Sequence, residues 1–243
     1  MARTVNVAEH TARRAEILDA AQRLILSTGY ERLTVQDILN DLQISKGAFY
    51  HYFDSKPTVI EALTTRLVSD SERALTPIVE NLGMGSVEKL RAVFGEIIRW
   101  KAKRQNLFVA MLPVWYAPEN LAFRLLVDRE SARRLAPLLS AIVRQGVNEG
   151  QFVTAYPDQA GPIIFAIIQG LQDAMARRLL EVQHRSPSPS TVKEMVNTHA
   201  AHLEAIERYL GVPTDTLARV DTRAVKSWIA ALHLAGASED GKR

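Results

Sequence analysis

The residues best suited to a chemical role lie in one short run of charged, aromatic and very small side chains. Lys46, Tyr50 and His51 supply an ammonium, a phenol and an imidazole, all of which bond phosphate oxygens or base edges. Gly47 and Ala48 are small where a close backbone approach would be needed. Glycine inside a short helix costs roughly 1 kcal/mol against alanine, so something other than helix stability favours it here. Two interpretations stay open from the pattern alone: a DNA-reading helix, or a small surface helix with two exposed aromatics.

Capping signals place this run on the second helix of a helix-turn-helix. Thr34, with Asp37 three positions on, is typical of an N-cap, and Ser45 is typical of a second N-cap after a tight turn. We therefore expect helices over about 34–42 and 46–53, the geometry that seats a second helix in the DNA major groove. The free N–H groups and positive dipole end of each helix start also suit phosphate.

The helices on either side complete a three-helix head. Apolar spacing predicts a first helix over about 8–27, followed by a capping glycine, and a long helix from Lys56 to about Glu80 with Pro57 in its first turn. The expected buried stripe of the first helix is Ile17, Ala20, Ala21, Leu24 and Ile25. The helix after Lys56 joins the head to the rest of the chain.

Charge neither requires nor excludes a nucleic-acid partner. The 243-residue chain has a formal net charge of +3, and residues 1–60 contain seven basic and seven acidic side chains. Any electrostatic footprint for DNA must therefore be local, on one face. The absence of cysteine excludes a disulfide framework and a thiolate metal site. No run approaches the roughly 18 apolar residues of a membrane span, and the N-terminus has no apolar signal core, so the cytoplasm is the expected compartment.

Helical periodicity continues to the C-terminus, so the expected fold class is all-α, with the head joined to a larger helical body. The expected body helices run over about 86–104, capped by Ser86, and over 119–149, 157–182, 191–210 and 221–234. Irregular features are expected as an aromatic segment between Pro113 and Pro118, a kink or break at Pro137, a linker at 186–190 and a polar tail after Gly236. The expected domains are 11–70, 71–235 and the tail 236–243.

Aromatic and soft side chains concentrate in the middle of the body, and polar residues lie on a largely buried helix beside them. Apolar walls with a few polar anchors are typical of a small-molecule pocket, although ordinary core is the competing interpretation for each residue. The candidates for effector binding are Trp100, Phe108, Met111, Trp115, Phe123, Phe165, Gln169 and Asp173, and Tyr116 and Gln172 lie beside them. An ionised Asp173 would favour a cationic or hydrogen-bond-donating ligand, unless Arg177, four residues on, pairs with it.

Two helices offer surfaces for a second subunit. Helix 157–182 is apolar almost all round in its first half, so it must be covered on two sides. Helix 191–210 has Ala200 and Ala201, which allow close approach, and we expect Ile206 at a homodimer interface between these helices. The stripe on this second helix is Met195, His199, Leu203, Ile206 and Leu210. A fully internal helix in a monomer is the alternative.

Two further groups of polar residues are expected to have structural rather than functional roles. His199 and His202 are three apart on a helix, but no companion ligand faces them, so we expect an interface histidine and no metal. The basic run Lys101–Arg104 is expected to complement a helix C-terminus.

The head contains three successive motifs. They are Ile17-Leu18-x-Ala20-Ala21, Gly29-Tyr30-x-x-Leu33-Thr34-Val35-x-Asp37-Ile38 and Ile44-Ser45-Lys46-Gly47-Ala48-Phe49-Tyr50-His51-Tyr52-Phe53-x-Ser55-Lys56. Together they cover nearly all of residues 12–63 and resemble the N-terminal signature of the tetracycline-repressor (TetR/AcrR) family of bacterial transcription regulators. In the body, Gly146-x-x-x-Gly150-x-Phe152, Pro157 and Gly170-Leu171 resemble that family's turn between its seventh and eighth helices. The sequence departs at Gln43, where the turn usually has glycine, and at Leu39 and Pro57.

The resemblance implies which residues read DNA. The expected DNA-contact set is Thr34, Ser45, Lys46, Gly47, Ala48, Tyr50, His51 and Lys56. Within it, the resemblance puts Tyr50 mainly on backbone phosphate, and assigns phosphate contacts to Lys56 and Thr34.

The resemblance also implies a sequence-specific, DNA-binding transcription regulator with a ligand-binding and dimerisation body. The favoured form is a repressor that binds a palindromic operator of double-stranded DNA as a homodimer and is released by a small, largely apolar effector. The alternative is a regulator whose body serves only for dimerisation or a protein partner. An enzyme is disfavoured, because no nucleophile–base–acid set, phosphate loop or HExxH motif appears, and no cofactor is expected.

Overall fold

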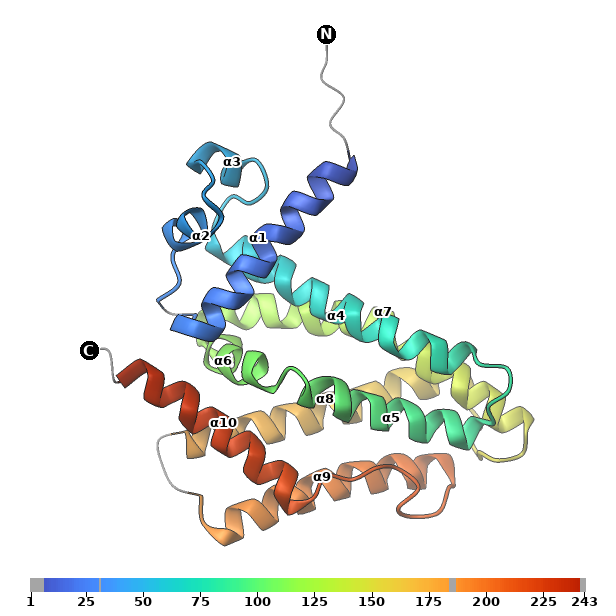
Figure 1. Ribbon diagram of the computed structural model, residues 1–243. Helices are drawn as coiled ribbons and strands as arrows, with labels where there is room; N and C mark the ends of the chain where they lie inside the picture. The colour runs from blue at the N-terminus through green and yellow to red at the C-terminus, as the bar shows by residue number, and fades with distance from the viewer. Residues whose placement is uncertain (1–6, 31, 184–186, 241–243) are drawn as a thin grey trace.

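The computed structural model describes residues 7–30, 32–183 and 187–240, and every regular element in these ranges is a helix. The order is α1 (Val7–Thr28), α2 (Val35–Leu42), α3 (Lys46–Tyr50), α4 (Lys56–Glu80), α5 (Ser86–Ala102), α6 (Gln105–Tyr116), the 3₁₀ turn η1 (Pro118–Asn120), α7 (Leu121–Asn148), α8 (Pro157–Val182), α9 (Pro189–Leu210) and α10 (Thr222–Asp240). Figure 1 shows α1–α3 at one end, α4 running from them into the body, and α8–α10 along the opposite side. None of the described helices is long and apolar enough to cross a membrane.

The head closes around a core that reaches into the body. Ile17, Ile38 and Phe49, from the first three helices, are fully buried together with the first turns of α4. Leu107 and Met111 of α6 belong to the same cluster of packed side chains. The head therefore rests on α6 as well as on α4.

The turn between α2 and α3 forms as the capping residues predict. Thr34 accepts a hydrogen bond from the Asp37 N–H at 3.1 Å, and the Asp37 carboxylate accepts one from the Thr34 N–H at 2.8 Å, completing a capping box. Gln43 ends α2 with φ 51°, in the left-handed region that disfavours a side chain with a Cβ. The departure from glycine at this position is thus accommodated at a backbone cost.

The body is built around α8, which lies between α7 and α9. Gly161 permits the α7–α8 crossing, because a Cβ there would lie 2.0 Å from the Ala136 carbonyl oxygen and 2.4 Å from Ser140 Oγ. Ser140 Oγ accepts from the Gly161 N–H and donates to the Asp158 carbonyl, each at 3.1 Å. Helices α7 and α8 therefore pack closely at this crossing and are also joined by hydrogen bonds.

The residues between α9 and α10 are organised by one buried carboxylate. Glu207 is fully buried and accepts hydrogen bonds from the Leu217 N–H at 2.8 Å and from Arg219 at 2.7 Å. Arg219 also donates to Asp215. The buried Glu207 carboxylate therefore has both hydrogen-bond donors and a cation as partners. The anchored loop fixes where α10 begins.

Several expected boundaries are wrong. The segment Pro113–Pro118 is helical as far as Tyr116, because α6 continues past Pro113 while packed against α1 and α10. Of the kink or break expected at Pro137, the break does not occur, since α7 is continuous there, and the kink stays a prediction. Helix α3 is shorter than expected, ending at Tyr50 in a turn. Gly85 precedes α5 where Ser86 was the expected cap, and the carboxylate of Glu149 accepts the Ser86 N–H at 2.9 Å.

The last two helices also begin or end outside the expected ranges. In the expected linker, Ser188 is the N-cap of α9, and Pro189 and Ser190 form its first turn; Ser186 lies outside the described residues. Helix α10 extends through Asp240, four residues beyond the expected start of the tail at Gly236, and residues 241–243 are not described.

Candidate functional site

The short helix α3 presents its polar residues to solvent. Ser45 caps the helix by accepting the Ala48 N–H at 3.1 Å. The exposed residues in this part of the chain are Ser45, Lys46, Gly47, Ala48, Tyr50 and His51. Phe49 is fully buried and Phe53 is nearly so, and these two side chains fix the helix to the head. The structure therefore brings six of the eight expected DNA-contact residues onto one small, anchored surface.

Aromatic contacts support the exposed surface from the side of α1. The ring of His10 lies 5.7 Å from that of His51 and 4.7 Å from that of Tyr52. The Lys46 ammonium lies 5.9 Å from the centre of the Tyr50 ring. His10 carries no sequence signal for this position, because only the folding of α1 over α3 brings it there.

The two remaining candidates have contacts inside the protein. Thr34 is engaged with Asp37, and these hydrogen bonds hold the pKa of the Asp37 carboxyl below its usual value. Lys56 donates from Nζ to the Tyr30 carbonyl oxygen at 2.7 Å and lies 4.0 Å from the centre of the Tyr30 ring. A phosphate contact for either residue stays a prediction.

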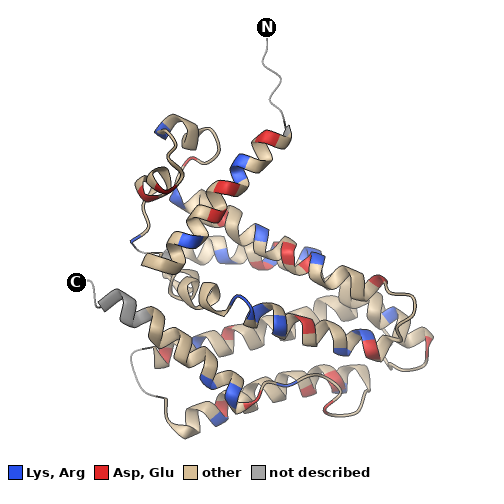
Figure 2. Ribbon diagram, in the orientation of Figure 1, with Lys and Arg blue, Asp and Glu red and all other residues tan. Residues whose placement is uncertain are grey.

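Charges on the head are mixed. Figure 2 shows basic and acidic residues interspersed along α1, and acidic residues on α2. Arg23 of α1 pairs with Asp41 of α2 at 2.7 Å, which neutralises both charges away from α3. A DNA contact at α3 would therefore depend on local groups rather than on a broad basic face.

A cavity of about 430 Å³ lies in the middle of the body. Its walls come from α4 to α10 and are mostly aliphatic and aromatic. Seven of the eight effector candidates line it: Trp100, Phe108, Met111, Trp115, Phe165, Gln169 and Asp173. Phe123 is not among the lining residues, because it packs against the head cluster and contacts Trp115 from outside, with ring centres 5.7 Å apart.

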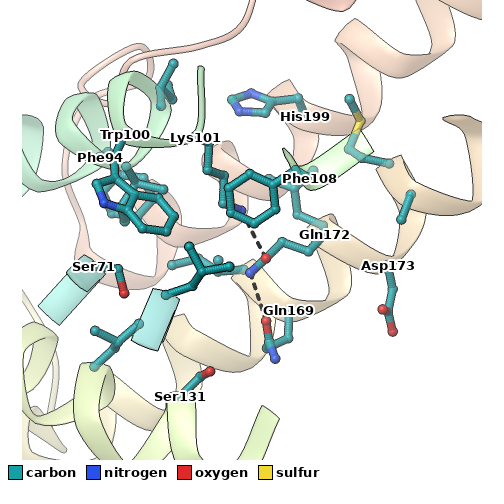
Figure 3. Close-up of a pocket in the computed structure, with 18 of the residues that line it drawn as sticks. Ser71, Phe94, Trp100, Lys101, Phe108, Ser131, Gln169, Gln172, Asp173 and His199 are labelled. Carbon is teal, nitrogen blue, oxygen red and sulfur yellow. Dashed lines mark hydrogen bonds between the residues drawn. The ribbon is translucent and has the colours of Figure 1, made fainter. Parts of the chain in front are cut away.

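A chain of hydrogen bonds crosses the polar part of this cavity. Lys101 Nζ donates to Gln172 Oε1 at 3.0 Å, and Gln172 Nε2 donates to Gln169 Oε1 at 2.8 Å, as the dashed lines in Figure 3 show. Gln169 Nε2 then donates to Asp128 Oδ1 at 2.8 Å. Burial raises the pKa of the Asp128 carboxyl above its usual value. The chain thus links a lysine at one end with a carboxyl group at the other.

Asp173 has a partner that the sequence did not suggest. The Tyr116 hydroxyl donates to its Oδ1 at 2.5 Å, and burial together with this contact raises the pKa of the phenol. Arg124 lies 4.7 Å from the centre of the Tyr116 ring. Arg177 is exposed, and in the described part of the chain no ion pair joins it to Asp173.

Sequence reasoning missed the role of two cavity-lining residues, Lys101 and His199. Lys101 was expected to complement a helix end, but its ammonium is directed to Gln172 of α8, and burial lowers its pKa to about 8. Arg104 does meet a helix end, donating to the Trp100 carbonyl at 3.4 Å. His199 lies inside the body rather than at an interface, and burial, with the nearby charges of Arg219 and Lys101, lowers its pKa to about 4.

The expected interface stripe of α9 is part of the core of its own chain. Ile206 is fully buried against α8 and the body core, so it cannot form a subunit interface. Met195, His199, Leu203 and Leu210 are likewise buried. The outward face of the helix pair is small and apolar instead, with exposed Ile163, Ala166 and Gly170 on α8 and exposed Ala201 and Ala205 on α9.

Comparison with known proteins adds independent information. A family model described as bacterial regulatory proteins, tetR family, matches residues 17–63. The HTH-type transcriptional repressor DhaR of Mycobacterium sp. (strain GP1) is 25% identical over 176 residues, which cover 72% of this chain and 85% of that protein. The HTH-type transcriptional repressor AcnR of Corynebacterium diphtheriae is 33% identical over 105 residues, which cover 42% of this chain and only 52% of that protein.

The fold also has counterparts among solved structures. The SmeT–triclosan complex aligns with a TM-score of 0.60 at 17% sequence identity, covering 87% of this chain and 97% of that one. The family match contains α2, α3 and the start of α4, where the exposed polar surface lies.

Proposed function

We propose that this chain, a helix-turn-helix DNA-binding transcription regulator of the TetR/AcrR family, is a repressor. It binds a palindromic operator as a homodimer and releases the operator when a small, largely apolar effector fills the body cavity. The observation that carries the proposal is the exposed polar surface of α3 on a head whose core includes two cavity-lining residues. In this proposal Lys46, Tyr50 and His51 contact the major groove and adjacent phosphates.

Those two residues give a physical route from effector to DNA. Leu107 and Met111 of α6 pack into the head core and also line the cavity. A ligand that needs more room moves α6, and the head that rests on α6 must follow. Release then requires that the ligand bind the DNA-incompetent arrangement more tightly than the DNA-bound one. The triclosan bound by the similarly folded SmeT supports a small-molecule site in this architecture.

The tryptophans offer a direct test of this link. All three tryptophans of the chain, Trp100, Trp115 and Trp228, line the cavity, so tryptophan emission reports on it. We expect an effector found in a screen of apolar compounds to shift tryptophan emission and to release operator DNA with the same midpoint concentration. The measurement is a paired titration of emission and DNA anisotropy. A compound that releases operator while leaving the emission unchanged would place the effector site elsewhere.

The exposed small face of α8 and α9 is the surface we assign to the dimer. Close helix approach across Ala166, Gly170, Ala201 and Ala205 would bury this face in a four-helix contact between two chains.

Ala201→Arg is expected to separate the dimer, because a guanidinium there would be buried without a partner. Light scattering after size exclusion should show a monomer, and operator affinity should fall because two half-sites must be held about one DNA turn apart. Ala230→Arg, the same change at an exposed position of α10, is the matched control and should stay dimeric. A dimeric Ala201→Arg protein with normal operator affinity would remove this face from the interface.

A further inference from the structure

The cavity contains a lysine without a counterion. Lys101 lies in the last turn of α5, lines the cavity, and donates one hydrogen bond, to the neutral Gln172 side chain. In the described part of the chain no carboxylate forms an ion pair with it. An ammonium has three donors, so two remain for another acceptor. Burial without a compensating anion is also why its pKa falls to about 8.

The acids that line the cavity already have donors. Glu96 pairs with Arg99 at 2.9 Å, Asp128 accepts from Gln169, and Asp173 accepts from Tyr116. In Figure 3 Asp173 projects from α8 away from Lys101. The acids that line the cavity therefore already accept hydrogen bonds from other side chains, whereas Lys101 has no anionic partner among the described residues.

A second donor lies on the lysine side. His199 lines the cavity, and its Nδ1 accepts the Val220 N–H at 3.4 Å. With its pKa lowered to about 4 the ring is neutral near pH 7, so its single proton is on Nε2, which is a donor. Of the two cations that lower this pKa, Arg219 is paired with Glu207 and Asp215, so the positive charge at this end of the cavity comes from Lys101. Two nearby donors in a positive potential recognise an anion with at least two acceptor oxygens.

From this arrangement we infer that the effector is an apolar monocarboxylic acid, with its carboxylate on Lys101 and its apolar body among Trp100, Phe108 and Phe165. The inference rests on the proposed function, since it names the class of ligand for the same cavity. The carboxylate supplies the counterion that Lys101 lacks, and the aromatic walls exclude water from the pair, which strengthens it.

The test uses three probes that share one apolar body: 1-naphthylacetic acid, 1-naphthylacetamide and 2-(1-naphthyl)ethylamine. Isothermal titration of the full-length dimer measures each affinity. We expect the acid to bind about 10- to 100-fold more tightly than the amide, the range that a charge-assisted hydrogen bond supplies.

Variants of α5 identify the group responsible. Lys101→Met should remove the preference for the acid, whereas Lys101→Arg should retain most of it. Lys103→Met, an exposed lysine on the same helix end, is the matched control and should leave the preference unchanged. Lys101→Met should also unfold at a higher temperature than wild type without ligand, because it removes an unpaired charge from the cavity wall.

Each other outcome has a definite meaning. Equal binding of the three probes, or tightest binding of the amine, would contradict the inference while leaving an effector cavity in place. A preference for the acid that survives Lys101→Met would also contradict it. No binding of any probe at millimolar concentration, together with no operator release by any apolar compound, would count against the effector part of the proposed function itself.

Discussion

Replacing both Lys46 and Tyr50 by alanine is expected to abolish specific operator binding while leaving the fold and the dimer intact. Both side chains are exposed, and the residue between them that anchors the helix, Phe49, is unchanged. Removing each side chain that binds DNA well should cost about 1–3 kcal/mol of binding free energy, and the dimer carries both changes at both half-sites. Exposed substitutions of this kind usually change stability by less than about 0.5 kcal/mol. Fluorescence anisotropy with labelled operator and thermal unfolding give the two readouts.

The matched control carries the same two changes in the body. Lys226 and Tyr156 are exposed on α10 and just before α8, and the Lys226→Ala, Tyr156→Ala protein should bind operator as wild type does. Wild-type affinity in the α3 variant would show that another surface reads the DNA. A large loss of thermal stability in the α3 variant would instead assign these side chains to the core.

Gly161→Ala is expected to destabilise the protein by about 3 kcal/mol or more, because the new methyl would overlap the Ala136 carbonyl and Ser140. Backbone atoms of α7 cannot move aside as a flexible side chain would, so α8 must be displaced and the two hydrogen bonds of Ser140 must break. Chemical denaturation of the purified protein measures the effect, and poor soluble expression is its extreme form.

Gly95→Ala, in α5, is the control. A Cβ at this position would meet only the far end of the Arg99 side chain, at 3.2 Å, and that side chain is exposed and can move aside. Alanine is the better helix former, so this variant should be as stable as wild type or more stable by up to about 1 kcal/mol. Similar losses of stability in both glycine variants would contradict the close α7–α8 crossing.

The helix-turn-helix could be predicted from sequence because its signals are local. The caps Thr34, Ser45 and the Lys56 helix start act within three or four residues, so the chain order alone places α2, α3 and α4. The pattern also predicted that Phe49 is buried and Tyr50 exposed, since one short helix cannot bury both of its sides. The error at α3 was only in its length.

The cavity chemistry and the interface could not be read in the same way. Periodicity identifies the apolar side of α9 but not what covers it, and the Ile206 stripe is covered by its own chain. Lys101 looked like one of several basic residues at a helix end, and only the packing of α5 against α8 directs its ammonium to Gln172. The Tyr116–Asp173 contact joins residues 57 positions apart, a separation that no local pattern encodes.

Selection of DNA fragments from a random pool by the purified full-length protein tests the central claim most directly. Because the exposed α3 surface occurs once in each subunit of a dimer, we expect one enriched inverted repeat, with half-sites about one helical turn apart. The same selection with Tyr50→Ala protein should enrich no such repeat. Recovery of no common sequence by the wild-type protein, or of the same repeat by the Tyr50→Ala protein, would contradict the assignment of α3 as the surface that reads DNA.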